Sequence, residues 1–443
     1  MWLEDVDAIA SEIRDKGYRR IAIQSSDVTA ATTLCTELSR RFHESEGKEE
    51  FYVLGDVFIG SCCTDLIAAK RCDADYVLHV GPSCQSSIAP QMPVRRVFNR
   101  VTLDESILRE RVNQVLGAHE FERVLIIYDT AVHHLRYVLC DILRHLHKET
   151  FIAECREYVS VNTECTGEQE TFCGRTVLSI TEKGEEAVTV DSLCLGDKNT
   201  LVVYIKTDTA CEGSLDQIAI SSAGSQFHVI HISNGNASES NEDSLGDKLR
   251  LRRYRNVEKV KAADTIGVMV VSRNLRHSSE LRLNLAKLIK HSGKRSYALS
   301  VNCLTEAKLA NFPNIDVYCL MSCGSAAMSL PDEISRRTVS PYDLLVGLDR
   351  MDWSMPYEFD FSRLLRYTHI EGVEKQDARK QEMRKLQGGT ELKVQVEAFM
   401  ATLPDNSKRT FSGVDPEYGI SDKPTIIKGF HGTASGYEHE RLL

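Results

Sequence analysis

The sequence contains no long apolar run, no excess of basic residues and no compact cysteine motif, and each absence excludes a class of protein. No stretch approaches the roughly 18 consecutive apolar residues of a membrane span. Lys and Arg number 54 against 64 Asp and Glu, a net charge of −10, whereas general nucleic-acid binders usually carry a basic excess. We therefore expect neither a membrane nor a nucleic acid as a partner.

The amino terminus lacks the features of a secretory signal. Met1 to Asp7 is acidic and contains no apolar segment, so we predict a cytoplasmic protein. The 14 cysteines are then expected to be reduced thiols, most of them buried in the core, and not a disulfide framework. No Cys-x-x-Cys pair indicates a zinc ribbon or a ferredoxin.

Short apolar runs alternate with helical patterns, and this alternation begins three times. The runs at 20–24, 123–128 and 265–271 each open such a series. Continuous β-branched runs separated by helices are typical of parallel sheets covered on both faces. The sequence therefore predicts an α/β fold of three parallel-sheet domains. The predicted limits are 1–118, 119–260 and 261–370, followed by a charged helix and an extended tail at 371–443.

Two polar segments depart from the alternation. The residues from Ser233 to Asp247 are rich in Ser, Asn, Gly and acids, which favours a mobile surface loop. Within the predicted tail, 374–385 is densely charged, which indicates a helix, and 404–443 is rich in turn residues. The tail is expected either to wrap on the body of the protein or to be disordered.

Two segments resemble each other as internal copies. Asp75 to Cys84 and Asp316 to Gly324 each run from an acidic residue through an apolar strand to a cysteine, Cys84 or Cys323. Thr200 to Cys211 is a weaker third copy. Buried strands often resemble one another by chance, so the similarity is weak evidence alone. It nevertheless favours three related α/β units.

Four cysteines occupy positions where open α/β sheets bind ligands, beyond the C-terminal ends of strands. Cys84 and Cys323 each follow a predicted strand. Cys62 and Cys63 follow the predicted strand at 51–55 and precede a helix, whose dipole favours the thiolate. Three strand ends could thus present thiolates to one point. Soft thiolates select zinc, copper(I) or an iron–sulfur cluster.

The residues alone leave packing as an alternative to a metal centre. A lone cysteine at a strand end is more often a buried packing residue than a ligand. The spacings are also long, 22 residues (84 − 62) and then 239 (323 − 84). The cysteines that fall within helix or strand patterns, and are interpreted as core, are Cys35, Cys72, Cys140 and Cys319.

The sequence around these cysteines resembles the diphthamide synthesis radical enzymes. The matching segments are Gly55–Asp65 with its double cysteine, Ala74–Asp75, His79–Cys84, Leu251–Val260, Leu309–Asp316 and Thr338–Leu344. The tail segments Arg409–Gly413 and Gly436–Glu438 resemble the second subunit of the eukaryotic enzyme in particular. The resemblance covers roughly residues 15–440.

The resemblance implies three Rossmann-like domains in a triangle around a [4Fe-4S] cluster. Catalytic members bind S-adenosylmethionine at the open iron of the cluster and cleave it to a 3-amino-3-carboxypropyl radical. The radical adds to a histidine ring carbon of elongation factor 2, the first step of diphthamide synthesis. The implied ligands here are Cys62 and/or Cys63, Cys84 and Cys323.

The middle domain departs from the catalytic pattern. Catalytic members carry a ligand cysteine after a segment like Gly174–Leu178, where this chain continues with Ser179 and Ile180. The nearby cysteines that do not fall in register are Cys165, Cys173 and Cys194. The second eukaryotic subunit shows the same loss, so the resemblance implies an accessory chain without catalytic residues of its own.

An accessory role implies particular partners. They are a catalytic first subunit that binds S-adenosylmethionine, elongation factor 2 as the substrate of the complex, and an electron-donor protein. The cluster of this chain would support reduction of the catalytic subunit's cluster. Two alternatives stay open: a self-sufficient homodimeric transferase, and a scaffold whose cysteines hold zinc or no metal.

Overall fold

The computed structural model describes residues 5–43, 49–55, 62–89, 91–161, 170–182, 184–271, 274–301, 304–353 and 356–369. The chain divides into two compact units, Met1–His369 and Ile370–Leu443. All of the described residues belong to the first unit. The predicted helix at 374–385, the predicted tail and the two matching tail segments therefore lie outside the described residues.

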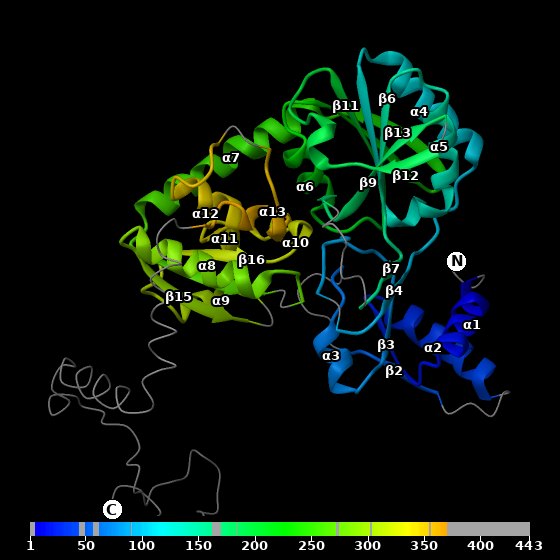
Figure 1. Cartoon of the computed structure of the whole chain (residues 1–443), viewed down its shortest axis with the longest axis horizontal. Coiled ribbons are helices and arrows are strands. Elements are labelled where there is room, and N and C mark those ends of the chain that lie inside the picture. Colours follow the sequence, from blue (N-terminus) through cyan, green and yellow to red (C-terminus); the bar gives the residue numbers. More distant parts are fainter. Residues whose placement is uncertain are drawn as a thin grey trace, which may run out of the picture. The chain divides into compact units, whose positions relative to one another are not determined.

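Three sheets form the described part of the chain, and their strands follow one plan (Figure 1). The first sheet contains β1 (Arg20–Ser25), β2 (Glu50–Val53), β3 (Tyr76–Val80), β4 (Val94–Val97) and β7 (Tyr158–Val159). The parallel strands of the second are β5 (Arg123–Tyr128), β6 (Glu149–Glu154), β11 (Thr200–Thr207) and β12 (Gln226–Ser233). The third contains β14 (Thr265–Val270), β15 (Arg295–Ser300), β16 (Val317–Met321) and β17 (Thr338–Val339).

In each sheet the four parallel strands lie in the order second, first, third, fourth. The orders are β2-β1-β3-β4, β6-β5-β11-β12 and β15-β14-β16-β17. This is the order of flavodoxin-like sheets. Such sheets bind ligands beyond the C-terminal ends of the first and third strands, at the point where the strand order reverses. The prediction of an α/β fold with parallel sheets is confirmed. The domain limits and the triangular arrangement stay predictions.

The copies detected in the sequence occupy equivalent places. Asp75 precedes β3 and accepts hydrogen bonds from the backbone N–H groups of Arg19 and Arg20. Asp316 precedes β16 and accepts in the same way from Asp264 and Thr265. Each aspartate thus ties the third strand of its sheet to the start of the first. The shared sequence pattern therefore reflects a shared structure.

Helices cover both faces of the first sheet (Figure 1). Ile21 and Ile23 of β1 pack with α1 (Val6–Lys16) and α2 (Val28–His43), while the intervening Ala22 packs with α3 (Leu66–Arg71) on the other face. This alternation follows from the two-residue period of a strand. It explains why β1 is buried at nearly every position, as expected of a parallel strand covered on both faces.

The second sheet carries additional antiparallel strands. They are β8 (Thr171–Phe172), β9 (Arg175–Thr181), β10 (Gly184–Ala187) and β13 (Asn236–Asn241). Its helices are α4 (Glu105–Ala118), α5 (Arg136–Arg144) and α6 (Ser214–Ser221), with 3-10 turns at Thr130–Leu135 and Val190–Leu193. Of these, α4, α5 and the turn at Thr130–Leu135 cover a core cluster built on the buried residues of β5 and β11.

The prediction of a mobile loop from Ser233 to Asp247 is wrong. Asn234 and Gly235 both have positive φ, 51° and 77°, and turn the chain from β12 into β13. Asn236–Asn241 pairs antiparallel with β12, and α7 (Asp243–Ala262) begins directly afterwards. Asn-Gly is a strong hairpin signal, and strand pairing at the sheet edge outweighs the polar composition.

The third sheet is surrounded by short helices. They are α8 (Ser278–His291), α9 (Glu306–Ala310), α10 (Gly324–Met328), α11 (Asp332–Ser335), α12 (Pro341–Gly347) and α13 (Phe361–Leu365). Ser340 caps α12 in a reciprocal capping box with Asp343, and Pro341 stands at the first helical position.

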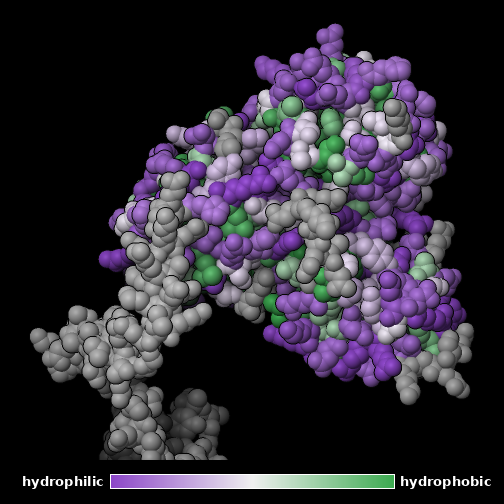
Figure 2. All heavy atoms as spheres, viewed as in Figure 1, coloured by the Kyte–Doolittle hydropathy of each residue, from purple (hydrophilic) through white to green (hydrophobic). Residues whose placement is uncertain are grey.

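The face of the molecule shown in Figure 2 is largely hydrophilic, with apolar residues scattered over it. None of the helices in the described ranges combines the length and the apolar character that crossing a membrane requires.

Candidate metal centre

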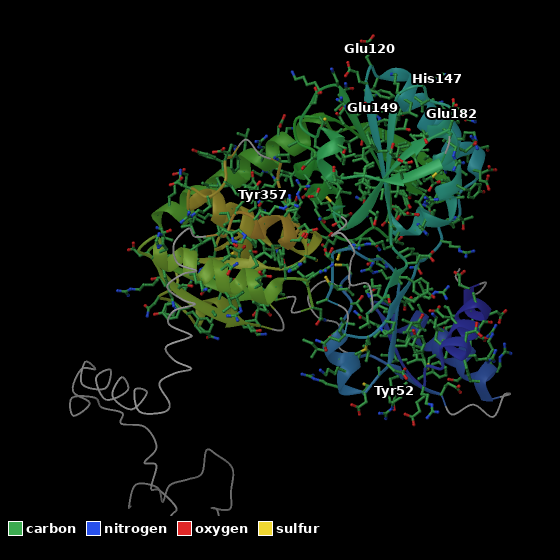
Figure 3. All side chains as sticks on the ribbon, viewed as in Figure 1. Tyr52, Glu120, His147, Glu149, Glu182 and Tyr357 are labelled. Carbon is green, nitrogen blue, oxygen red and sulfur yellow. The ribbon has the colours of Figure 1, made fainter. Side chains whose placement is uncertain are left out.

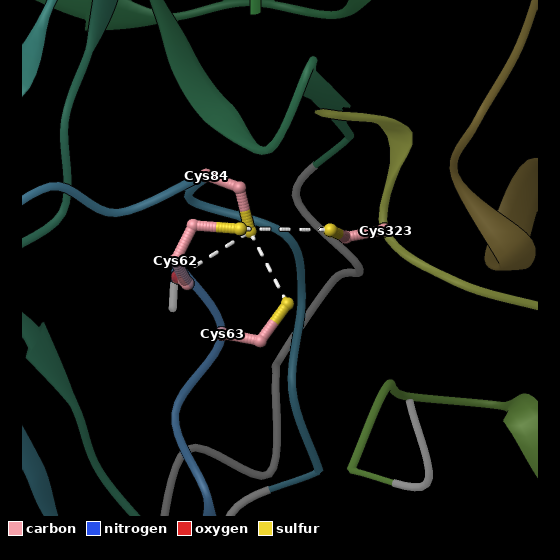
Figure 4. A group of neighbouring side chains, drawn as sticks. All are labelled: Cys62, Cys63, Cys84 and Cys323. Atoms are coloured by element: carbon pink, nitrogen blue, oxygen red, sulfur yellow. Dashed lines mark hydrogen bonds between the residues drawn. The ribbon is translucent and has the colours of Figure 1, made fainter. Parts of the chain in front are cut away.

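Four cysteines that are distant in sequence meet at one buried point. Cys62 and Cys63 lie between β2 and α3, Cys84 lies beyond β3, and Cys323 lies between β16 and α10 (Figure 4). Their sulfur atoms all lie within 4.8 Å of one another. The structure therefore brings together all four residues that the sequence singled out.

Two sulfur contacts join different segments (Figure 4). The Sγ atoms of Cys62 and Cys323 are 3.8 Å apart, and those of Cys63 and Cys84 are 3.6 Å apart. Cys62, Cys84 and Cys323 are at most 7% exposed. A group of thiols this close and this buried either shares protons or holds a soft metal.

Hydrogen bonds from β1 hold the double-cysteine segment in place. The side-chain amide of Gln24, at the end of β1, donates to the carbonyl of Cys63 at 2.9 Å and accepts from the N–H of Asp65 at 2.7 Å. Asp65 in turn caps α3 by accepting from Ile67 and Ala68. The first strand of the sheet thereby fixes the loop that carries two of the four thiols.

His79 of β3 joins the two cysteine-bearing segments of the first sheet. Its Nδ1 lies 3.2 Å from the hydroxyl of Thr64, next to Cys63, and its Nε2 lies 3.3 Å from the carbonyl of Pro82. Burial, and then the positive charge of Arg96, lower the pKa of His79 to about 4. The imidazole is thus neutral and positions the loops without adding charge.

The thiols strongly perturb one another. The pKa of Cys84 lies well below the usual range, because Cys323, Cys62 and Cys63 stabilise its thiolate by hydrogen bonding. Contact with Cys211, and then with Cys323, raises the pKa of Cys62, and contact with Cys323 raises the pKa of Cys63. A soft cation bound by these thiols would displace their protons.

Comparison with known families identifies the chain. Residues 28–358 match the model of the family described as "Putative diphthamide synthesis protein". The chain belongs to this family. The resemblance inferred from the cysteine-bearing motifs is therefore confirmed at the level of the family.

Curated relatives in the diphthamide synthesis family carry the name 2-(3-amino-3-carboxypropyl)histidine synthase subunit 2. The Gallus gallus protein is 28% identical over 371 residues, which cover 83% of this chain and 73% of the relative. The Schizosaccharomyces pombe protein is 28% identical over 316 residues, covering 71% and 59%. The chain thus spans from about three fifths to about three quarters of these two relatives' lengths.

Solved structures of the family share this fold. The crystal structure of Dph2 from Pyrococcus horikoshii with a 4Fe-4S cluster has a TM-score of 0.54 at 16% identity, covering 80% of this chain and 93% of that one. A second crystal structure of the same archaeal protein has the same TM-score at 15% identity, covering 80% and 92%.

Sequence reasoning missed a fifth thiol at the centre. Cys211 follows β11, is 7% exposed, and contacts the side chain of Cys62. It occupies the place in the second sheet that Cys84 and Cys323 occupy in the first and third, beyond the third strand. The weak internal copy from Thr200 to Cys211 was the signal that could have identified it.

The other middle-domain positions lie elsewhere. Ser179 lies inside β9 and pairs with Phe151 of β6. It is therefore three residues along the strand from Thr176, which pairs with Glu154 near the start of β9. Cys173 is buried and lines a cavity of about 30 Å³ together with Cys323, room for about one water molecule. Cys194 is exposed, and Cys165 lies outside the described residues.

The cysteine group fits a soft metal, and its spacing bears on which one. Four thiols, here three buried and one partly exposed, are the donor set of both [4Fe-4S] and structural zinc sites. Tetrahedral zinc with Zn–S bonds of about 2.3 Å separates its ligands by roughly 3.8 Å, close to the observed 3.6 and 3.8 Å. A four-iron cluster spreads its thiolates farther apart, so binding one would require these side chains to move outward.

Proposed function

We propose that this chain is the iron–sulfur subunit of a heterodimeric 2-(3-amino-3-carboxypropyl)histidine synthase. The complex would transfer a 3-amino-3-carboxypropyl group from S-adenosylmethionine to a histidine of elongation factor 2, in the cytoplasm. The observation that carries the proposal is the convergence of Cys62, Cys63, Cys84 and Cys323 within 4.8 Å. The names of the relatives and the cluster in the archaeal neighbour's structure support it.

In this proposal the chain assists catalysis and does not perform it. A [4Fe-4S] cluster held by four thiolates supplies one-electron transfer. Four protein ligands leave no open iron for S-adenosylmethionine, which is assigned to the catalytic partner subunit. The role of this chain is to pass an electron from a donor protein to that partner. Its own residues would hold the cluster, exclude water and set its potential.

Metal analysis of the heterodimer tests the cluster assignment. The complex is purified without oxygen, and iron, acid-labile sulfide and electron paramagnetic resonance spectra are measured for wild type, Cys84→Ser and Cys323→Ser. We expect the wild-type complex to carry two clusters and each variant one. Cys35→Ser is the matched control, because Cys35 lies in α2, away from the centre. Equal iron in all four proteins would contradict the assignment.

An activity assay tests the accessory role. Modification of elongation factor 2 is measured by mass spectrometry with this chain alone, with its partner alone and with both. We expect modification only when both are present. Modification by this chain alone would replace the proposal with a self-sufficient, homodimeric transferase.

A zinc-binding scaffold is the second candidate, supported by the 3.8 and 3.6 Å separations of two of the sulfur pairs. The same metal analysis separates the two, because zinc is colourless, carries no sulfide and gives no paramagnetic signal. One zinc per chain and no iron in protein prepared without oxygen would assign Cys62, Cys63, Cys84 and Cys323 to a structural site. The chain would then support its partner by shape alone.

A further inference from the structure

Arg96 is a buried cation in the first sheet, whose segments carry Cys62, Cys63 and Cys84. It lies in β4, opposite His79 of β3, and is 3% exposed. Its Nη1 donates to the side-chain carbonyl of Gln85 at 3.2 Å and to the backbone carbonyl of Arg156 at 3.1 Å. Both acceptors are neutral. Arg96 makes no ion pair with a carboxylate in the described ranges, and its Nε has no hydrogen-bond partner there.

An uncompensated buried cation is costly, because burial removes the hydration that stabilises its charge. The pKa of Arg96 is lowered to about 10, first by burial and then by Arg156, while Cys84, Cys155 and Cys63 act in the opposite direction. The guanidinium therefore stays protonated at neutral pH. The groups that stabilise the charge of Arg96 are thus cysteines, and two of them, Cys84 and Cys63, belong to the metal centre.

Gln85 links this cation directly to the centre. It is fully buried, follows Cys84 and has a positive φ of 61°. Its Oε1 accepts from Arg96 and from the backbone N–H of Arg156 at 2.9 Å. The residue next to a predicted ligand is thus held by the guanidinium, so the charge of Arg96 is fixed relative to the thiols and cannot move away.

We infer that Arg96 is the fixed counter-charge of the metal centre and raises its reduction potential. The inference rests on the proposed function. Four thiolates around a [4Fe-4S] core of charge 2+ carry a net charge of 2−. One electron from a one-electron reductant takes the core to 1+ and the net charge to 3−, with no bond formed or broken. A nearby cation stabilises the more negative state, and net charge and burial are what set cluster potentials.

The test measures the midpoint potential of the full chain in complex with its partner. Dye-mediated titration with dithionite, followed by electron paramagnetic resonance, is performed on wild type, Arg96→Met and Arg96→Lys. We expect Arg96→Met to lower the reduction equilibrium constant of this chain's cluster about tenfold, which is about 59 mV for one electron. Arg96→Lys keeps the charge and should retain most of the wild-type potential. Arg96→Gln, which can still hydrogen-bond, replaces Arg96→Met if that variant does not fold.

Arg95→Met is the matched control. Arg95 is the preceding residue of β4, so its side chain leaves the other face of the sheet, and its charge is already paired with Glu12 at 2.7 Å. We expect its midpoint to match wild type. An unchanged midpoint potential in iron-loaded Arg96→Met would overturn this inference and leave the proposed function standing. An equal shift in Arg96→Met and Arg96→Lys would do the same, because the effect would then not depend on the charge. Absence of iron from the wild-type chain overturns the proposed function and this inference with it.

Discussion

Asp343 is a fully buried carboxylate that forms an ion pair with Arg253. It accepts from Arg253 at 2.8 Å, from Asn256 at 3.1 Å and from the hydroxyl of Tyr357 at 2.8 Å. Tyr357 lies beside α12 (Figure 3). Removing the cation would leave the carboxylate buried and unpaired, so we expect Arg253→Met to lower the free energy of unfolding by about 3–5 kcal/mol. Urea unfolding measures this loss. Arg252→Met, at an exposed position of the same helix, should stay within about 0.5 kcal/mol of wild type.

Glu358 gives the chain a pH-dependent stability of its own. Burial raises its pKa to about 7 from an ordinary 4.5, although Arg363 lies 3.1 Å away and opposes the shift. The folded state therefore binds the proton more tightly than the unfolded state. The stabilisation is fully present below about pH 4.5 and is lost as the pH rises through about 7. Glu358→Gln should remove a pH dependence of the free energy of unfolding worth on the order of 3 kcal/mol across that window. Denaturant midpoints at several pH values measure it, and the exposed Glu333→Gln should keep the wild-type slope.

The turn between β8 and β9 supports the segment that carries Cys84. Gly174 in this turn has a φ of +81°, and an added Cβ would lie 2.3 Å from the carbonyl oxygen of Gln85. Gly174→Ala must therefore displace the backbone next to Cys84, and we expect metal affinity to fall about tenfold or more. Chelator competition measures the affinity. Gly293→Ala is the matched control, because Gly293 has a φ of +75° and no neighbouring atom within 4 Å. Equal affinity in both variants would show that the turn does not constrain the site.

The secondary-structure elements also show how far the sequence could predict the site. Apolar runs located the central strands, because strands buried on both faces leave a continuous signal. The repeated pattern ending at Cys84 and Cys323 pointed to equivalent strand ends, and the sheets do share one strand order. Cys211 was missed because the segment Thr200–Cys211 matches the other two copies only weakly. The strand β13 was missed because its pairing with β12, and not its own polar composition, determines its conformation.

The cysteine group connects parts of the chain that the backbone leaves far apart. Cys62, Cys63 and Cys84 belong to the segments of the first sheet, whereas Cys323 follows a strand of the third, 239 residues after Cys84 (323 − 84). Cys62 and Cys323 are also in sulfur–sulfur contact at 3.8 Å. A metal bound by all four would therefore cross-link two sheets, and its binding free energy would add to the stability of the folded chain.

Metal removal should consequently destabilise the chain through Cys323 in particular. At a free metal concentration about 100 times the dissociation constant, binding adds about 2.7 kcal/mol to the free energy of unfolding. We expect anaerobic thermal unfolding of wild type to shift to lower temperature when the metal is removed, and we expect Cys323→Ser to lose most of that difference. Cys35→Ser should behave as wild type, because Cys35 packs in the core of the first sheet. If metal removal lowered the midpoints of wild type and Cys323→Ser equally, the metal would be held by the first sheet alone, and the third sheet would contribute packing and no ligand.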